Sequence, residues 1–183
     1  KAKESDFGNI EPLDEYGRAK YFASQYIATA QNIISLRLFG VFGKYEDFTT
    51  RFISNAICRA LFDLPIIVRQ NAVFDYIYVK DLVAIIAHFI VHTPKQKFYN
   101  AGRGEGIELL ALAKIIKAAT GGKADIIIKN PGMGREYTCD NSLLKSEIPD
   151  LKFTPIETAV AELTDWYREN LSKIDKNKLD FDT

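Results

Sequence analysis

Residues 32–43, NIISLRLFGVFG, decide the fold class that the sequence predicts. The almost unbroken apolar run over 33–39 ends at Gly40, and such runs are typical of parallel strands that are buried on both faces. Apolar residues at spacings of three and four precede it over 14–31 and predict a helix. A helix that leads into a buried strand is half of a repeating α/β pattern.

The rest of the chain continues this alternation of apolar patterns. Further strands are expected at 64–68, 74–79, 97–102 and 125–130, and further helices at 49–63, 80–92, 107–122 and 155–170. The polar segment 173–183 is expected to be a frayed tail. Strands that alternate with helices predict an α/β fold with a parallel sheet and right-handed crossovers.

The composition excludes several classes of protein. The chain has 183 residues, of which 47% are hydrophobic, so it can bury a core. Its formal net charge is zero, which argues against a nucleic-acid groove or a membrane-surface protein. The longest apolar stretch, 82–91, is too short to span a bilayer. Cys58 and Cys139 lack metal-site spacing, so we expect reduced thiols, no metal and a cytoplasmic location.

Tyr16 and Lys20 are four residues apart in the first predicted helix and therefore lie on one face. An ammonium beside a phenol favours the phenolate and lowers the tyrosine pKa from about 10 toward neutral pH. Such a tyrosine can take a proton from a sugar hydroxyl while hydride leaves the carbon. The alternative is two solvated side chains. Tyr76 and Lys80 share the spacing, but in a predicted strand, where the two side chains cannot meet.

Four segments, in this order, resemble the extended short-chain dehydrogenase/reductases. More narrowly, they resemble the NAD-dependent epimerase/dehydratase family that acts on nucleotide sugars. The segments are EPLDEYGRAKYFASQYI (11–27), ISLRLFGVFGKY (34–45), FDYIYVKDLVAII (74–86) and FYNAGRGEGIELLALAKII (98–116). The resemblance implies the C-terminal part of a Rossmann-like parallel sheet plus a small substrate-binding lobe.

The same resemblance assigns roles to residues of the first two segments. In the family the tyrosine is the acid/base and the lysine holds the nicotinamide ribose, which implies these roles for Tyr16 and Lys20. Phe39 stands where the family's backbone approaches the nicotinamide. The implied cofactor is NAD or NADP, and these three residues are its candidate binding residues.

The substrate implied by the resemblance is a nucleotide-diphosphate sugar, but two positions depart from the family pattern. Gly40 is the candidate substrate-binding residue at a position where the family has an asparagine that contacts substrate, and Phe74 replaces an arginine that grips the diphosphate. Arg69 and Arg135 are then the candidates for the diphosphate, because a guanidinium matches phosphate in a bidentate fork. For Arg135 the alternative is a solvated loop arginine.

The family's glycine-rich dinucleotide turn is not found at its expected place. Gly102, Gly104 and Gly106 follow a predicted strand, but they form GxGxG rather than GxGxxG and belong by resemblance to a later turn. We therefore expect the first half of the Rossmann fold to be absent. An edge strand of a parallel sheet that has no neighbour favours association with another chain. The sequence therefore predicts a homo-oligomer.

The resemblance also predicts a division into lobes. Residues 1–43 and 80–101 would be the remnant of the dinucleotide-binding domain, 44–79 and 102–172 the substrate-binding lobe, and 173–183 the tail. Two functions stay open. The first is the C-terminal part of an NAD(P)-dependent nucleotide-sugar epimerase/dehydratase of polysaccharide biosynthesis, inactive by itself. The second is a non-catalytic nucleotide-sugar-binding or oligomerisation fragment.

Overall fold

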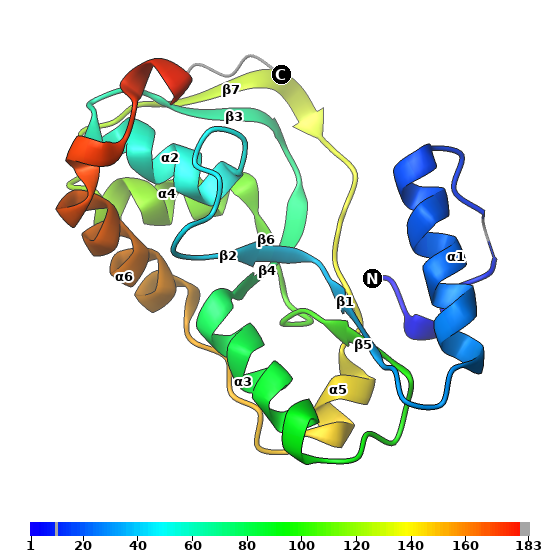
Figure 1. Ribbon diagram of the computed structural model, residues 1–183. Helices are drawn as coiled ribbons and strands as arrows, with labels where there is room; N and C mark the ends of the chain where they lie inside the picture. Colours follow the sequence, from blue (N-terminus) through cyan, green and yellow to red (C-terminus); the bar gives the residue numbers. More distant parts are fainter. Residues whose placement is uncertain (10, 180–183) are drawn as a thin grey trace.

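The computed structural model describes residues 1–9 and 11–179 (Figure 1). The α-helices are α1 (Glu15–Thr29), α2 (Phe52–Leu61), α3 (Val79–Val91), α4 (Leu109–Ala119), α5 (Ser142–Glu147) and α6 (Ile156–Glu169). The strands are β1 (Ser35–Leu38), β2 (Gly40–Phe42), β3 (Ile66–Asn71), β4 (Val73–Tyr78), β5 (Phe98–Ala101), β6 (Gly106–Glu108) and β7 (Ile126–Met133). Three 3₁₀ turns complete the set: η1 (Glu4–Asp6), η2 (Leu171–Lys173) and η3 (Lys176–Leu179).

The described strands form three small sheets, and parallel pairing dominates. β1 pairs with β5 and β3 with β7, both parallel. In the third sheet β4 lies between β2, which is parallel to it, and β6, which is antiparallel. The predicted α/β class with parallel pairing is therefore confirmed. The short elements β6 and α5 were not expected from the sequence.

The run over 33–39 is not the single strand that the sequence predicts. The strand is interrupted at Phe39. Before it, β1 pairs with β5, and after it, β2 pairs with β4. Burial on both faces is also wrong: Leu38 is 46% exposed, and the other residues of β1 are only half-buried. Among the described strands β1 has a neighbour on one edge only, which leaves its apolar side chains partly uncovered.

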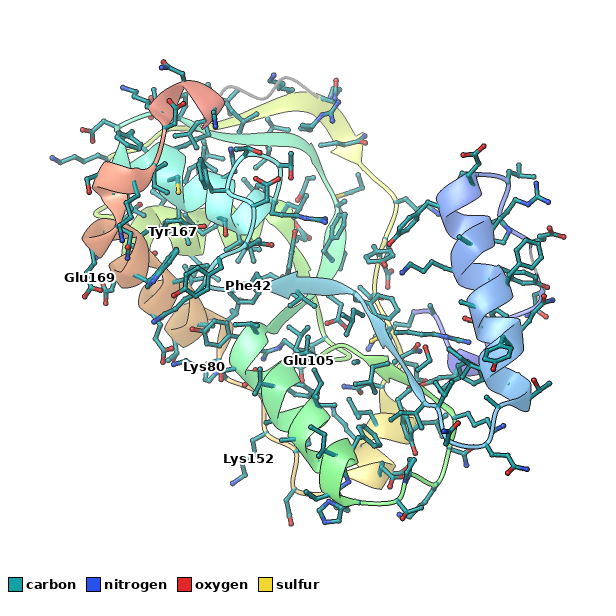
Figure 2. The ribbon with its side chains drawn as sticks, in the orientation of Figure 1. Phe42, Lys80, Glu105, Lys152, Tyr167 and Glu169 are labelled. Atoms are coloured by element: carbon teal, nitrogen blue, oxygen red, sulfur yellow. The ribbon has the colours of Figure 1, made fainter. Side chains whose placement is uncertain are left out.

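The larger hydrophobic core joins α2, α4 and α6 to β3 and to the end of β2 (Figure 1). Figure 2 labels two of its members, Phe42 on β2 and Tyr167 on α6, each about 1% exposed. Ile57 on α2 is completely buried in the same cluster. Since the apolar residues of α2 fall on one face at helical spacing, this core follows directly from the sequence pattern.

A smaller core lies between α3, β5 and α5. It contains Ile77, Ile85, Tyr99 and Leu144, and partly buried residues up to Phe153 pack on it. The segment from α5 to Phe153 therefore packs with the part of the chain that carries β1 and β5, rather than with the larger core. The predicted division into lobes stays a proposal. It assigns this segment to the substrate-binding lobe, whereas the segment packs in the smaller core.

The predicted frayed tail is wrong for residues 173–179. Leu179 is 1% exposed and belongs to the larger core, and Ile174 packs against that core. The Arg59 guanidinium donates a hydrogen bond of 2.8 Å to the Leu179 carbonyl. The two apolar side chains and this hydrogen bond hold the polar segment against the larger core. Residues 180–183 of the predicted tail lie outside the described residues.

No helix in the described part of the chain combines the length and the apolar character needed to cross a bilayer. Helix α1 stands on the far side of β1 from α3 (Figure 1), and none of its residues is buried. The segment that follows β7 runs past β1 on the side that faces α1 (Figure 1). These neighbours frame the candidate site.

Candidate active site

Tyr16 and Lys20 meet on the first turns of α1. The helix begins after Asp14, whose carboxylate accepts a hydrogen bond of 2.7 Å from the Gly17 amide and caps the amino end. The Lys20 ammonium lies 5.4 Å from the centre of the Tyr16 ring, and the Tyr16 side chain is 76% exposed. The predicted pair thus shares one face, with the phenol accessible to a ligand.

Tyr137 is a further aromatic residue of this region, and the sequence analysis did not single it out. Its amide donates to the Val73 carbonyl at 2.8 Å, and its carbonyl accepts from the Asp75 amide at 3.0 Å. These two hydrogen bonds fix the segment after β7 against β4. The only sequence signal was its place two residues after Arg135.

The Tyr137 ring connects α1 with the strands. Its centre lies 5.0 Å from that of Phe39 and 5.8 Å from that of Phe74. Partial burial raises the pKa of the Tyr137 phenol, and the Tyr16 phenol acts on it electrostatically in the same direction. Phe39, Phe74 and Tyr137 therefore form an aromatic wall, and Tyr16 is near enough to Tyr137 to act on it electrostatically.

Gly40 brings β2 close to β4. A Cβ atom at this position would stand 2.6 Å from a Tyr76 ring carbon and 2.8 Å from the Asp75 carbonyl oxygen. The Tyr76 ring therefore occupies the space that a side chain at position 40 would need. The glycine that departs from the family pattern is explained by packing, and its predicted place in substrate binding stays a proposal.

The two candidate arginines are both exposed: Arg69 lies in a strand, and Arg135 lies in the segment after β7. Arg69 lies in β3, and Arg135 follows Gly134, whose amide donates to the Asn71 carbonyl at 2.7 Å. Arg135 therefore lies on the same segment as Tyr137. Within the described residues, no contact joins either arginine to Tyr16 or Lys20, so their role in substrate binding stays a proposal.

The turn over 102–106 is occupied by protein. The amides of Arg103 and Gly104 each donate a hydrogen bond of 2.8 Å to the Asp75 carboxylate, which is fully buried. Cys139 also donates to this carboxylate, at 3.3 Å. Because Asp75 already binds these two amides, they are not available to cradle a phosphate. This agrees with the interpretation of GxGxG as a later structural turn.

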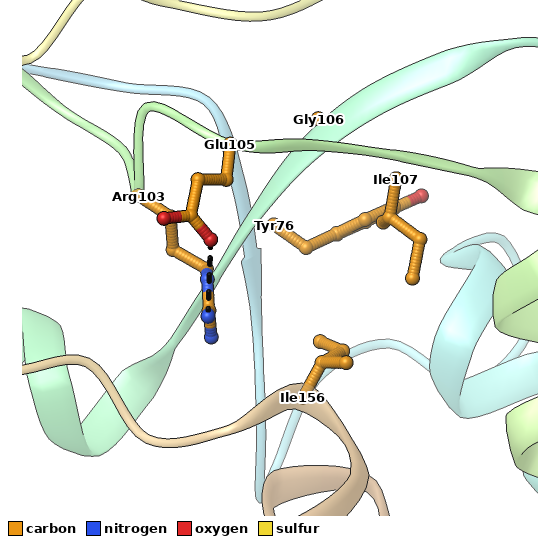
Figure 3. A pocket seen from close by; sticks show the side chains of 6 residues that line it. All are labelled: Tyr76, Arg103, Glu105, Gly106, Ile107 and Ile156. Carbon is orange, nitrogen blue, oxygen red and sulfur yellow. Dashed lines mark ion pairs between the residues drawn. The ribbon is translucent and has the colours of Figure 1, made fainter.

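A cavity of about 180 Å³ opens beside this turn. Figure 3 shows Tyr76, Ile107 and Ile156 on its apolar side, with Arg103 and Glu105 opposite. These two charged groups form an ion pair with 3.8 Å between nitrogen and oxygen. Across residues 1–9 and 11–179, no cluster of three or more histidine, cysteine or acidic side chains is arranged to hold a metal.

The model of the NAD dependent epimerase/dehydratase family matches residues 1–102, more than half of the chain. The chain belongs to this family. The resemblance drawn from the four sequence segments is confirmed, and the family that it names is NAD dependent.

Two curated relatives illustrate the range of the epimerase/dehydratase family around this chain. It is 26% identical over 188 residues to ADP-L-glycero-D-manno-heptose-6-epimerase of Brachyspira hyodysenteriae, covering 93% of this chain and 58% of that protein. It is 28% identical over 112 residues to GDP-L-fucose synthase of Dictyostelium discoideum, covering 59% of this chain and 35% of that protein.

Solved structures share the fold of this epimerase/dehydratase chain. UDP-glucose 4-epimerase of Thermotoga maritima, solved with UDP-glucose, superposes with a TM-score of 0.78 at 22% identity, covering 93% of this chain and 58% of that one. For dTDP-glucose 4,6-dehydratase of Bacillus anthracis, in complex with NAD, the TM-score is 0.74 at 19% identity, with 94% and 58% covered. The chain thus spans somewhat more than half the length of these proteins.

Proposed function

We propose that this chain carries the acid/base pair and part of the substrate site of a nucleotide-sugar epimerase or dehydratase. The observation that carries the proposal is the exposed Tyr16 phenol, which has the Lys20 ammonium 5.4 Å from its ring centre. The membership in the epimerase/dehydratase family supports it. The relatives that act on ADP-, GDP-, UDP- or dTDP-linked sugars support the substrate class.

In this proposal each side chain has a separate task. Tyr16 takes the proton from a sugar hydroxyl as the carbon is oxidised and returns it when the carbon is reduced. Lys20 places its ammonium against the Tyr16 ring and offers further donors to a ribose. Phe39 and Tyr137 form the wall that orients the sugar toward Tyr16. Arg135, on the same segment as Tyr137, binds the diphosphate.

Part of the site fits the family's dinucleotide. Tyr16, Lys20 and Phe39 are the residues that would hold the nicotinamide end of NAD or NADP, and the exposure of Tyr16 leaves room there. When bound, the cofactor supplies the acceptor and donor of hydride. The amides of the 102–106 turn are taken by Asp75, so the pyrophosphate end finds no cradle there.

Because this turn is not the family's dinucleotide turn, its occupation by Asp75 does not decide between turnover and binding alone, and a second candidate function stays open. A chain that binds a nucleotide sugar without holding the whole dinucleotide would act as a non-catalytic binding module. The two functions share the substrate and differ in turnover.

The test pairs binding with turnover. The protein is titrated with UDP-glucose and related nucleotide sugars by calorimetry, and with NAD and sugar it is assayed for product and for absorbance at 340 nm. Tyr16→Phe should lower turnover about 10²- to 10⁴-fold and leave sugar-nucleotide affinity unchanged. Tyr26→Phe, a change of the same type on the same helix, should alter neither.

Arginine variants decide which guanidinium binds the diphosphate. Arg135→Ala should weaken binding of the nucleotide sugar about 10- to 100-fold, while Arg69→Ala should not. Turnover that is lost in Tyr16→Phe would favour the enzyme over the binding module, because a binding module has no turnover to lose. Absence of both would contradict the two functions together.

A further inference from the structure

The loop between β2 and α2 is fastened to the larger core at two neighbouring residues. The Glu46 carboxylate accepts a hydrogen bond of 2.5 Å from the Ser54 hydroxyl, and Ser54 is completely buried on α2. Next to it, the Tyr45 ring centre lies 5.2 Å from that of Trp166 on α6. Tyr45 has a φ of 69°, a left-handed conformation that is costly for a bulky residue. The two contacts therefore hold a strained stretch of backbone in place.

The second half of the same loop is organised independently of Glu46. The Asn55 amide donates to the Phe48 and Thr49 carbonyls at 3.0 and 3.3 Å. The Asp47 carboxylate accepts from both the amide and the hydroxyl of Thr49 and from the hydroxyl of Thr50. Release of the Glu46 carboxyl would therefore loosen residues 44–46 from α2, while the Glu46 amide still donates to the Gly43 carbonyl at 3.3 Å and the remainder of the loop stays anchored.

The surroundings of Glu46 disfavour its charged form. Burial raises the pKa of its carboxyl from 4.5 to about 7, although the Ser54 hydroxyl and the Arg51 guanidinium act in the opposite direction. Asp47 repels the carboxylate and adds to the shift. The remaining polar neighbours are the phenols of Tyr76 on β4 and Tyr167 on α6, whose own pKa values burial raises, so both stay neutral.

We propose that residues 44–46 form a pH-operated strap, seated on α2 and α6 while the Glu46 carboxyl is protonated and loosened when it ionises. The seated carboxyl keeps its proton up to about pH 7, whereas a released one would ionise near its ordinary value of 4.5. Between these values the seated form binds more protons. The free energy that favours the seated over the released form has its full value below pH 4.5. It falls as the pH rises and reaches a constant, lower value above about pH 7.

The strap is linked to β4 through Tyr76. Glu46 acts electrostatically on Tyr76, and the Tyr76 ring packs where a Cβ of Gly40 would lie. Ionisation of Glu46 therefore changes the electrostatic surroundings of Tyr76 at the start of β2. The inference concerns the conformation of the chain and does not depend on the proposed catalytic activity.

Trp166 is the only tryptophan of the chain. Its ring centre lies 5.2 Å from that of Tyr45 and 4.9 Å from that of Tyr167, so its emission should change when the Tyr45 contact is lost. We expect the emission of the whole chain to change reversibly between pH 4.5 and 7, with the seated-to-released ratio falling by up to about tenfold per pH unit. Glu46→Gln keeps an oxygen acceptor for Ser54 but does not titrate, so its emission should stay at the low-pH value. Tyr45→Ala removes the reporting contact and should flatten the titration.

Glu169→Gln is the matched control, because this exposed carboxyl lies three residues from Trp166 on α6. It should keep the wild-type transition. Far-UV circular dichroism at both ends of the range should be unchanged, since only the strap moves. The proposal is overturned if the wild type shows no transition, if Glu46→Gln or Tyr45→Ala retains it, or if the helices melt together with it.

Discussion

Helix α2 and helix α1 are held in the fold by different means. Most residues of α2 are buried in the larger core, whereas none of the fifteen residues of α1 is buried. The candidate chemistry nevertheless lies on α1, at Tyr16 and Lys20. The larger core therefore provides most of the stability of the fold, while the position of the candidate acid/base pair depends on a few contacts along α1.

Those contacts can be named. The Phe7 ring, just before α1, lies 5.0 Å from the ring of Tyr21, centre to centre. At the carboxyl end of the helix the Lys97 ammonium donates to the carbonyls of Ala28 and Ala30, at 2.8 and 2.5 Å. Ring contacts and polar contacts of this kind contribute less than a buried aliphatic face.

A matched pair of substitutions tests the comparison most strongly. Ile57→Ala, in the completely buried face of α2, should lower the free energy of unfolding by about 2–5 kcal/mol. Ile27→Ala makes the same change in α1, where the side chain is only half-buried, and should cost no more than about 1 kcal/mol. Urea denaturation measures both. Equal losses would mean that α1 is packed as firmly as α2, and the comparison would fail.

A smaller effect is expected at Gly40, where β2 approaches β4. Gly40→Ala would force a Cβ against the Tyr76 ring and the Asp75 carbonyl and should cost about 1–3 kcal/mol, because the backbone oxygen cannot give way. Leu38→Ala, in the half-covered neighbouring strand, removes more atoms but should cost less. If Gly40→Ala is neutral in denaturation, β2 and β4 do not approach as closely as described.

Much of the fold could be predicted from the sequence because the spacing of apolar residues indicates which face of each helix or strand is buried. The pattern of α2 predicted its buried face, and the alternation of elements predicted the α/β class. What spacing could not predict is where a neighbour is missing. The run over 33–39 is apolar enough for burial on both faces, yet Leu38 is 46% exposed since β1 has a described neighbour on one edge only.

The candidate site was predictable only where spacing along a helix fixes geometry. Tyr16 and Lys20 are neighbours because four residues make one turn, and the structure brings them together. Tyr137 is more than a hundred residues away from them in sequence, and only pairing of its segment with β4 brings it to Phe39. The occupation of the 102–106 turn by Asp75 is likewise a tertiary contact that no local pattern encodes.

The smallest effect is expected at the carboxyl end of α1, where Lys97 binds the last carbonyls of the helix. Lys97→Met removes the two hydrogen bonds to the Ala28 and Ala30 carbonyls, together with a cation placed favourably at a helix carboxyl end, a loss of about 0.3–1 kcal/mol. Amide hydrogen exchange should accelerate about two- to fivefold in α1 and stay unchanged in α2. Lys95→Met removes the same charge two residues earlier without removing these hydrogen bonds, and it should leave exchange in α1 as in the wild type. Equal acceleration in both helices would mean that α1 opens only with the larger core, so that the acid/base pair would share the stability of that core after all.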